Sequence, residues 1–232
     1  MLITDRQKDI LDKIIQEYIS SAEPVPSQSL EKKYDFGLSP ATIRGEMHKL
    51  TEEGFLYQPH TSAGRVPTDK GYRFFVDNLL NKEFDIFSAE NWFAKELDDN
   101  LKIIQKLTDN LAYHSGALTF GYDRNDDILW KEGWEEILKE PEFEERDYLI
   151  NFTEFSENFE NNIKELEIDS GIKIYIGKEN PFSKTKEFTI ISAECTLPDH
   201  HGIVLSLLGP KRMAYDKNIG LMNSLIELME RF

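Results

Sequence analysis

The first third of the chain carries apolar residues at helical spacing, separated by short polar breaks. The first such stretch opens on a capping-box pattern, in which Thr4 is followed three residues later by Gln7. The residue before Pro24 disfavours helical backbone, so we expect the helix to end before it. The apolar positions give one buried stripe: Ile10, Leu11, Ile14, Ile15, Tyr18 and Ile19. The pattern therefore predicts an amphipathic first helix.

Two shorter helices are predicted next. Ser27 is the expected N-cap of the second helix, and residues 35–38 are typical of a turn. Ser39 then caps a third helix that has Pro40 at its first position. Gly54 is placed to end this helix in the left-handed conformation. The inward side of the third helix is formed by Ile43, Met47 and Leu50.

The period of the pattern then changes from helix to strand. Residues 55–58 and 65–67 are predicted strands, joined as a hairpin by the loop 59–64. A further helix is predicted over 72–80. Three short helices followed by a β-hairpin is the order of elements in a winged helix-turn-helix. We therefore expect residues 1–80 to form a domain of this kind.

The rest of the chain mixes helices and strands, which predicts an α+β fold class. A long helix over 88–114 either packs on its own domain or pairs with a second subunit, and a last amphipathic helix covers 219–229. The predicted strands are 116–122, 172–176, 188–195 and 202–208, the last of them ended by Gly209 and Pro210. We divide the chain into the domain 1–80, a linking or dimerising helix within 81–114, and a small α+β domain over 115–232.

Charge is distributed unevenly along the 232 residues. The chain holds 27 Lys and Arg against 43 Asp and Glu, a net charge of −16. Residues 81–170 carry 9 basic and 24 acidic side chains, whereas residues 1–80 carry 10 and 12. Only the first third can therefore face a polyanion without strong repulsion.

Cysteine usage and the N-terminus indicate the compartment. Cys195 is the one cysteine, so it cannot form an internal disulfide, which fits a reducing environment. The N-terminus is too charged for the apolar centre of a signal peptide, and the apolar runs are far shorter than the roughly 20 residues of a membrane helix. We expect a soluble, cytoplasmic protein with no membrane partner.

The third helix carries the first half of a candidate DNA-binding site. Arg44 is suited to a forked contact with guanine, and the Ser39-capped N-terminus favours a nearby phosphate. Gly45 either allows close approach to base edges or is simply tolerated, at a cost of about 1 kcal/mol relative to Ala. A helical projection places Ala41, Gly45, His48 and Glu52 outward and Thr42, Arg44 and Lys49 on the flanks, and all of these except Glu52 are assigned to the site.

The hairpin and the helix after it carry the second half of the candidate site. The hairpin tip is rich in hydrogen-bond donors and small residues and has no acid, which favours a wing lying on the DNA backbone over a simple turn. The residues assigned to this half are His60, Thr61, Ser62, Arg65, Lys70 and Arg73.

One stretch is long and unusual in composition. Residues 58–74 read Gln-Pro-His-Thr-Ser-Ala-Gly-Arg-Val-Pro-Thr-Asp-Lys-Gly-Tyr-Arg-Phe. Shorter stretches accompany it at 5–7, 18–25, 38–44, 46–47, 176–177, 179–181 and 208–215. Together they resemble the heat-inducible transcription repressor HrcA family, densely over 1–80 and moderately over 172–232.

This resemblance implies a fold, a function and partners. It implies a winged-helix domain followed by a GAF-like domain. It further implies a homodimer that represses chaperone genes from an inverted-repeat operator called CIRCE, is inactivated by heat, and is kept active with help from the chaperonin GroEL. An alternative hypothesis is a ligand-sensing regulator that binds a small molecule in its GAF-like half.

The sequence departs from the family's usual pattern in three respects. Gly45 stands where the family usually has Asn, and Pro26 and Gln28 stand where it tends to have Gly and Arg. Only residues 123–127 separate the first strand of the GAF-like domain from Ile128, so the family's dimerising insertion is expected to be absent. A dimer would then use another surface, either the helix 88–114 or the C-terminal helix.

Catalytic and metal sites are not predicted. The carboxylates of the middle region fit a solvated helical face better than a glycosidase pair. His200 and His201 lie in one short stretch without a second ligand cluster, so zinc is not expected. No Gly-rich phosphate loop precedes a helix. We therefore expect no enzyme activity and no cofactor.

Overall fold

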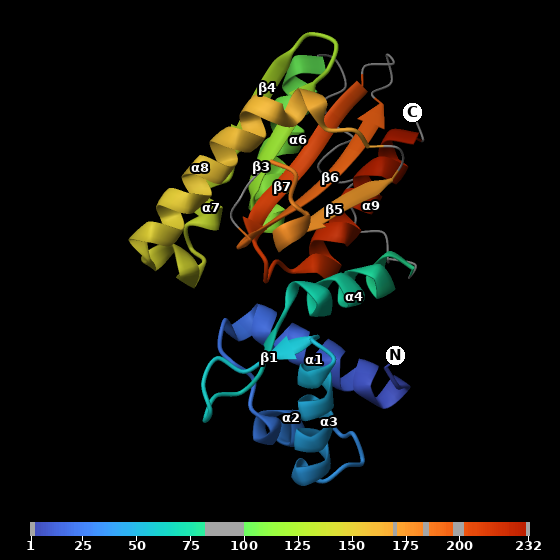
Figure 1. The fold of residues 1–232 in the computed structure, drawn as a ribbon. Coiled ribbons are helices and arrows are strands. Elements are labelled where there is room, and N and C mark those ends of the chain that lie inside the picture. Colours follow the sequence, from blue (N-terminus) through green and yellow to red (C-terminus); the bar gives the residue numbers. More distant parts are fainter. Residues whose placement is uncertain (1–2, 82–99, 169–170, 183–185, 197–201, 231–232) are drawn as a thin grey trace. The chain divides into compact units, whose positions relative to one another are not determined.

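The computed structural model describes residues 3–81, 100–168, 171–182, 186–196 and 202–230 (Figure 1). The chain divides into two compact units, Met1–Lys82 and Glu83–Phe232. The predicted segments around 88–99 and 199–201, including His200 and His201, lie outside the described residues.

The first unit begins with three helices, α1 (Asp5–Ser21), α2 (Ser27–Lys33) and α3 (Pro40–Glu52). The predicted capping box is confirmed, because Thr4 accepts a hydrogen bond from the Gln7 amide while the Gln7 side chain reaches back to the Thr4 amide. The prediction for Ser27 was wrong. Pro26 is the N-cap, its carbonyl accepts the first helical bonds, and Ser27 is the first residue of α2.

A two-stranded hairpin and a fourth helix complete the first unit. Strand β1 (Leu56–Tyr57) pairs antiparallel with β2 (Val66–Pro67), and α4 (Asp69–Leu80) begins three residues earlier than predicted. Its N-cap is Thr68, whose side chain accepts from the Gly71 amide. Gly54 has the predicted left-handed backbone, with φ +78°, and turns the chain from α3 into β1.

The core of the first unit lies between these helices and the hairpin. Helix α1 packs against α3, α4 and β2, and α2 packs against α3. The predicted apolar stripes supply the buried side chains, among them Ile10, Leu11, Ile14, Ile15, Leu30, Ile43, Met47 and Leu50.

The second unit is built on a five-stranded antiparallel sheet in the order β4-β3-β7-β6-β5 (Figure 1). Its strands are β3 (Leu118–Asp123), β4 (Ile128–Glu132), β5 (Ile172–Ile176), β6 (Phe188–Thr196) and β7 (Gly202–Pro210). Gly209 and Pro210 do not end the last strand early, because they still pair with Thr189 and Phe188. Pro210 is the last residue of the strand, so the amide hydrogen that proline lacks is missing only at the strand's end.

Helices cover both faces of this sheet. On one face, α8 (Arg146–Asn162) contributes Phe152, Phe155 and Phe159 to an aromatic core cluster with the sheet residues Phe120 and Phe188. On the other face lie α6 (Asn100–Ser115) and α9 (Tyr215–Glu230) (Figure 1). The short helices are α7 (Trp134–Ile137), η1 (Pro141–Glu144), η2 (Ile163–Glu165) and η3 (Gly177–Glu179).

The burial of α9 bears on one expectation about dimerisation. Its apolar side chains are mostly buried in its own unit, among them Ile219, Leu221 and Leu225, whereas Asp216, Lys217 and Glu227 are exposed. The exposed side of α9 is therefore polar rather than an apolar stripe. Helix α6 is more open, and its Tyr113 side chain is 71% exposed.

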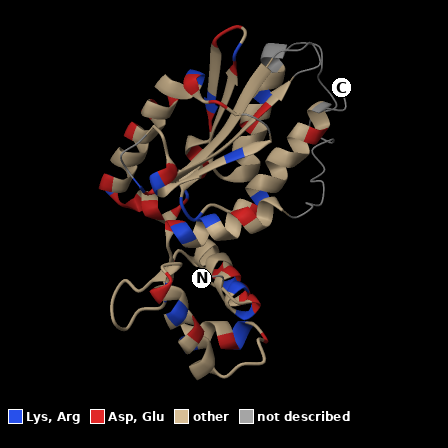
Figure 2. Ribbon diagram, turned by 45° about the vertical axis from the view of Figure 1, so that its right-hand side comes forward, with Lys and Arg blue, Asp and Glu red and all other residues tan. Residues whose placement is uncertain are grey.

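Acidic residues lie along α8 and along the short helices that precede it (Figure 2). Not all of them form the expected solvated face. Arg212, which is 8% exposed, donates to the carboxylates of both Glu140 and Glu142 and fixes η1 to the turn after β7.

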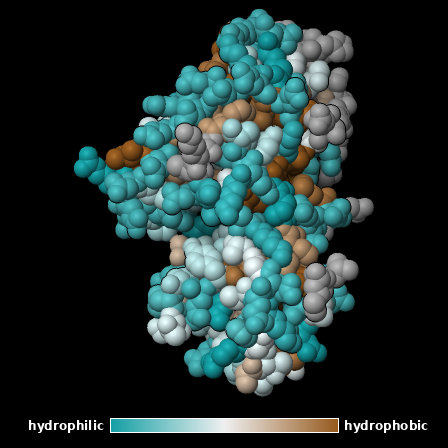
Figure 3. All heavy atoms as spheres, viewed as in Figure 1, coloured by the Kyte–Doolittle hydropathy of each residue, from teal (hydrophilic) through white to brown (hydrophobic). Residues whose placement is uncertain are grey.

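On the face shown in Figure 3, apolar side chains appear only in scattered patches between hydrophilic ones. None of the helices, over the ranges given above for the structure, is both long and apolar enough to cross a membrane.

Candidate nucleic-acid interface

Helix α3 presents one side of the candidate interface. The Ser39 hydroxyl accepts from the Thr42 amide at 3.2 Å, so the predicted N-cap is confirmed. The helical projection is also confirmed, since every residue that it placed outward or on the flanks is exposed: Ala41, Thr42, Arg44, Gly45, His48, Lys49 and Glu52.

The charges on α3 are partly neutralised by acids of the same helix. Lys49 donates to Glu46 at 3.3 Å, and His48 lies 3.5 Å from Glu52, with which it pairs when protonated. Glu46 is buried and also accepts from Gln7 at 2.9 Å. Arg44 differs from these cations, because it is exposed and makes no hydrogen bond or ion pair with any residue that the structure describes. It is the α3 cation most available to a ligand.

The loop between β1 and β2 forms the other side of the interface. The Gln58 side-chain amide donates to the carbonyls of Thr61 at 3.0 Å and Ala63 at 2.8 Å. The Ala63 amide donates to the His60 carbonyl at 2.9 Å and closes a β-turn, and Ser62 lies 3.3 Å from the His60 ring. The stretch 58–64 carries no charged residue and is drawn in tan in Figure 2. The loop is therefore fixed by its own hydrogen bonds.

The base of the hairpin is tied to the segment between α1 and α2. Val25 and Arg65 exchange backbone hydrogen bonds of 2.9 Å in both directions. A Cβ on Gly64 would lie 2.3 Å from the Val25 carbonyl carbon. Gly64 is thus required for close backbone approach, a role that sequence reasoning did not assign to it.

Arg65 is half-buried at this base. Its Nε donates to the Thr51 hydroxyl of α3 at 3.0 Å. Burial lowers the pKa of the Arg65 guanidinium, although such a group stays charged at neutral pH. Arg65 therefore clamps the hairpin to α3 and still presents a charge beside the loop.

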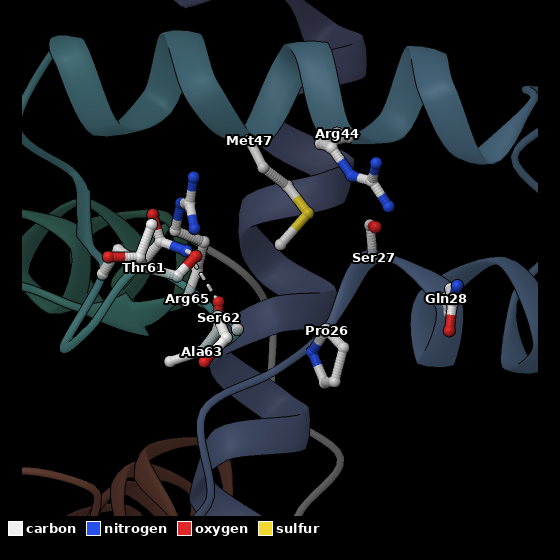
Figure 4. A pocket seen from close by; sticks show the side chains of 11 residues that line it. Pro26, Ser27, Gln28, Arg44, Met47, Thr61, Ser62, Ala63 and Arg65 are labelled. Atoms are coloured by element: carbon white, nitrogen blue, oxygen red, sulfur yellow. Dashed lines mark hydrogen bonds between the residues drawn. The ribbon is translucent and has the colours of Figure 1, made fainter.

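A hollow of about 420 Å³ lies between α3, the start of α2 and the loop (Figure 4). In that view Arg44 and Arg65 lie on opposite sides of Met47. Three polar residues in the lining were not predicted as site residues, Ser27, Gln28 and Gln58, and none of them belongs to a charge pattern that would single it out. The full lining is Pro26, Ser27, Gln28, Arg44, Met47, Gln58, Thr61, Ser62, Ala63, Gly64 and Arg65.

Two predicted site residues lie elsewhere in the first unit. Lys70 donates to the Glu53 carbonyl at 2.6 Å and stands over the Phe55 ring, 4.1 Å from its centroid. Arg73 pairs with Asp77 at 3.3 Å one turn along α4. Neither lines the hollow, so the structure does not bring them together with Arg44.

Comparison of the sequence with known proteins shows the family to which the chain belongs. The family described as HrcA protein C terminal domain matches residues 72–219, more than half of the chain. The chain belongs to the HrcA family. A heat-inducible transcription repressor HrcA from Thermoanaerobacter sp. (strain X514) is 47% identical over 120 residues, which are 50% of this chain and 35% of that protein. The HrcA of Natranaerobius thermophilus is 28% identical over 324 residues, covering 96% of this chain and 94% of that one.

The HrcA relatives differ from this chain in length, and their names state a class of protein. The match to the Thermoanaerobacter HrcA spans about a third of that relative's length. The longer alignment covers 324 positions against 232 residues here, so the Natranaerobius HrcA has residues without a counterpart in this chain. Both HrcA proteins are named as transcription repressors, a class distinct from enzymes.

A solved structure matches the fold. A crystal structure of a hypothetical protein has a TM-score of 0.81 and 21% identity, and covers 99% of this chain and 98% of its own. At this identity the likeness supports the mixed α/β fold of the HrcA chain and carries nothing about its function.

Proposed function

We propose that the chain is a DNA-binding transcription repressor of heat-shock genes, and that its first unit is a winged helix-turn-helix. The observation that carries the proposal is the hollow between α3 and the hairpin loop. Two guanidinium groups, those of Arg44 and Arg65, line it together with the uncharged loop. Cationic side chains beside small polar ones are suited to a sugar–phosphate backbone.

The docking follows from the exposed face of α3. A recognition helix enters the major groove mainly with its N-terminal half. In this half Ala41 is small enough for close approach, and Arg44 has the free fork that a guanine requires. The hairpin then acts as the wing and lies along the neighbouring backbone, with the phosphates passing through the hollow.

Specificity requires two such units. One winged helix reads few base pairs, and a two-fold dimer matches an inverted repeat. We therefore propose a homodimer on a CIRCE-type operator. Because the exposed side of α9 is polar, we favour α6, with its exposed Tyr113, for the dimer contact. Light scattering on the operator complex should give two chains per full operator, and one chain would contradict the dimer.

The regulatory part of the proposal rests on family resemblance. Loss of repression on heating and help from the chaperonin GroEL are expected of an HrcA protein. A refolding assay tests the second point, since GroEL should raise the fraction of heat-treated chain that regains operator binding.

A gel-shift assay tests the function itself. The chain should shift an inverted-repeat operator at concentrations where a duplex with scrambled half-sites stays free. A thermal-shift screen of small molecules, run in parallel, tests the alternative hypothesis of a ligand sensor. Ligand-dependent stabilisation without operator binding would favour that alternative.

A further inference from the structure

The loop between β1 and β2 is held by the side chain of Gln58, and its stretch 58–64 contains neither Arg44 nor Arg65. Gln58 is half-buried at the end of β1, and one amide nitrogen donates to two carbonyls of the loop, those of Thr61 and Ala63. Residues 58–64 include no Lys, Arg, Asp or Glu, and His60 is the one weakly basic side chain among them. A DNA contact by this loop must then come from hydroxyls, the histidine or the main chain.

Several carbonyl groups of the loop already accept hydrogen bonds, whereas two of its main-chain amides remain available as donors. The carbonyls of His60, Thr61 and Ala63 each accept a hydrogen bond within the loop. The amides of Thr61 and Ser62, at the exposed centre of the turn, have no acceptor among the residues that the structure describes. Main-chain amides of this kind are regular donors to phosphate oxygens.

We propose that Gln58 is a positioning residue, which holds the loop so that the Thr61 and Ser62 amides face a DNA phosphate. This inference rests on the proposed function. Gln58 itself touches the loop rather than the DNA, and it acts by fixing the peptide planes before binding. Without it the loop would be ordered only on binding, which lowers affinity through lost conformational entropy.

The arrangement has a signature in salt dependence. Cationic contacts release counterions from DNA and set the slope of log affinity against log salt concentration. An amide contact carries no full charge, so removing it lowers affinity and leaves that slope unchanged. Removing Arg65, the proposed phosphate contact, should lower both.

Two variants with matched controls test the inference, by fluorescence anisotropy with a labelled inverted-repeat operator duplex and the full chain. Gln58→Met keeps the length of the side chain and removes both donated hydrogen bonds, while Gln16→Met makes the same exchange on an exposed position of α1. Thr61→Pro removes one amide at the second position of the turn, where proline is favoured. Thr61→Ala removes the side chain and keeps that amide.

We expect Gln58→Met and Thr61→Pro each to weaken operator binding about tenfold with an unchanged salt slope. Gln16→Met should bind like the parent, and Thr61→Ala, which keeps the amide, should bind more tightly than Thr61→Pro. Thermal melting of each variant checks folding, and if Gln58→Met unfolds, the comparison of Thr61→Pro with Thr61→Ala decides alone.

The inference is overturned if Thr61→Pro binds like Thr61→Ala, or if a folded Gln58→Met binds like the parent. A salt slope that falls together with the affinity would also overturn it, because a cation would then have been displaced. These results differ from a failure of the proposed function, in which the parent chain itself would not prefer the operator.

Discussion

Gly45 lies in the middle of α3 with no atom within 4 Å of the position that a Cβ would occupy. Nothing inside the first unit therefore requires glycine there. A glycine in a helix interior costs about 1 kcal/mol relative to alanine. A position that weakens the helix without an internal reason is suited to close contact with a partner, and Gly45 is exposed, as Arg44 is.

Gly45→Ala should therefore raise the stability of the first unit by up to about 1 kcal/mol and lower operator affinity at the same time. The added methyl group would stand between the helix and the base edges. Thermal melting and operator titration on the same preparation check both effects. An unchanged or improved affinity would mean that Gly45 is only tolerated.

Arg65 combines a charge and a clamp, which two variants separate. Arg65→Ala should weaken binding to all duplexes alike and flatten the salt dependence by about one phosphate contact. Thr51→Val removes the acceptor of the Arg65 Nε and keeps the charge, so its salt slope should stay that of the parent. Salt titrations of both variants on operator and scrambled duplex give the comparison. Equal slopes for Arg65→Ala and the parent would show that Arg65 serves the fold alone.

At the level of residues, the sequence predicted exposure better than pairing. The helical period placed Arg44, Gly45 and Lys49 outward correctly, because one face of α3 is fixed by its apolar stripe. It could not show that Lys49 shares the buried Glu46 with Gln7, which lies 39 positions away. The bond from Lys70 to the Glu53 carbonyl, 17 positions away, was missed for the same reason, whereas the pair of Arg73 with Asp77 is local to α4.

The elements of the first unit are held at the hairpin base by backbone contacts. Gly64 packs against Val25, and Gly71 packs against the Phe55 carbonyl, 2.3 Å from where its Cβ would lie. Side chains at either glycine would force the hairpin away from its neighbours. The position of the hairpin relative to α3 thus depends on these two close approaches.

Gly64→Ala should destabilise the first unit by about 1–3 kcal/mol, because the main-chain atoms of Val25 cannot move aside as a flexible side chain would. Gly45→Ala is the matched control, since it makes the same exchange where space is open. Thermal melting of the full chain measures both. A Gly64→Ala chain as stable as the parent would show that the hairpin base is not close-packed.

Element boundaries followed from local signals where caps and turns were present. The Ser39 cap and the left-handed Gly54 were predicted and are observed, whereas strand β4 was not predicted. The end of β7 was predicted too early, because pairing with β6 carries the strand through Pro210. Pairing between strands depends on distant residues, which a local pattern does not contain.

Charge dominates the behaviour expected of the whole molecule. Residues 81–170 hold 9 basic and 24 acidic side chains, and such an excess opposes the compact state by self-repulsion. Screening relieves exposed charges more than the buried pairs of Arg212. Weak stability of this region would make the folded fraction steep in temperature, since about 1.4 kcal/mol changes the folded ratio tenfold.

Added salt should therefore raise the melting temperature of the full chain while it lowers operator affinity. Differential scanning fluorimetry and operator titrations at low and moderate salt test the two responses together. A melting temperature that does not rise with salt, or one far above heat-shock temperatures, would contradict a thermal switch based on charge repulsion.

The central claim is that the face of α3 around Arg44 reads an inverted-repeat operator, and competition anisotropy tests it most directly. Unlabelled operator and a duplex with scrambled half-sites compete for the parent, for Arg44→Ala and for Lys70→Ala, whose residue lies outside the hollow. We predict that the parent strongly prefers the operator, that Arg44→Ala loses about 1–3 kcal/mol on the operator and far less on the scrambled duplex, and that Lys70→Ala keeps the parent's preference. A parent that binds both duplexes equally, or an Arg44→Ala chain that discriminates as well as the parent, would contradict the claim.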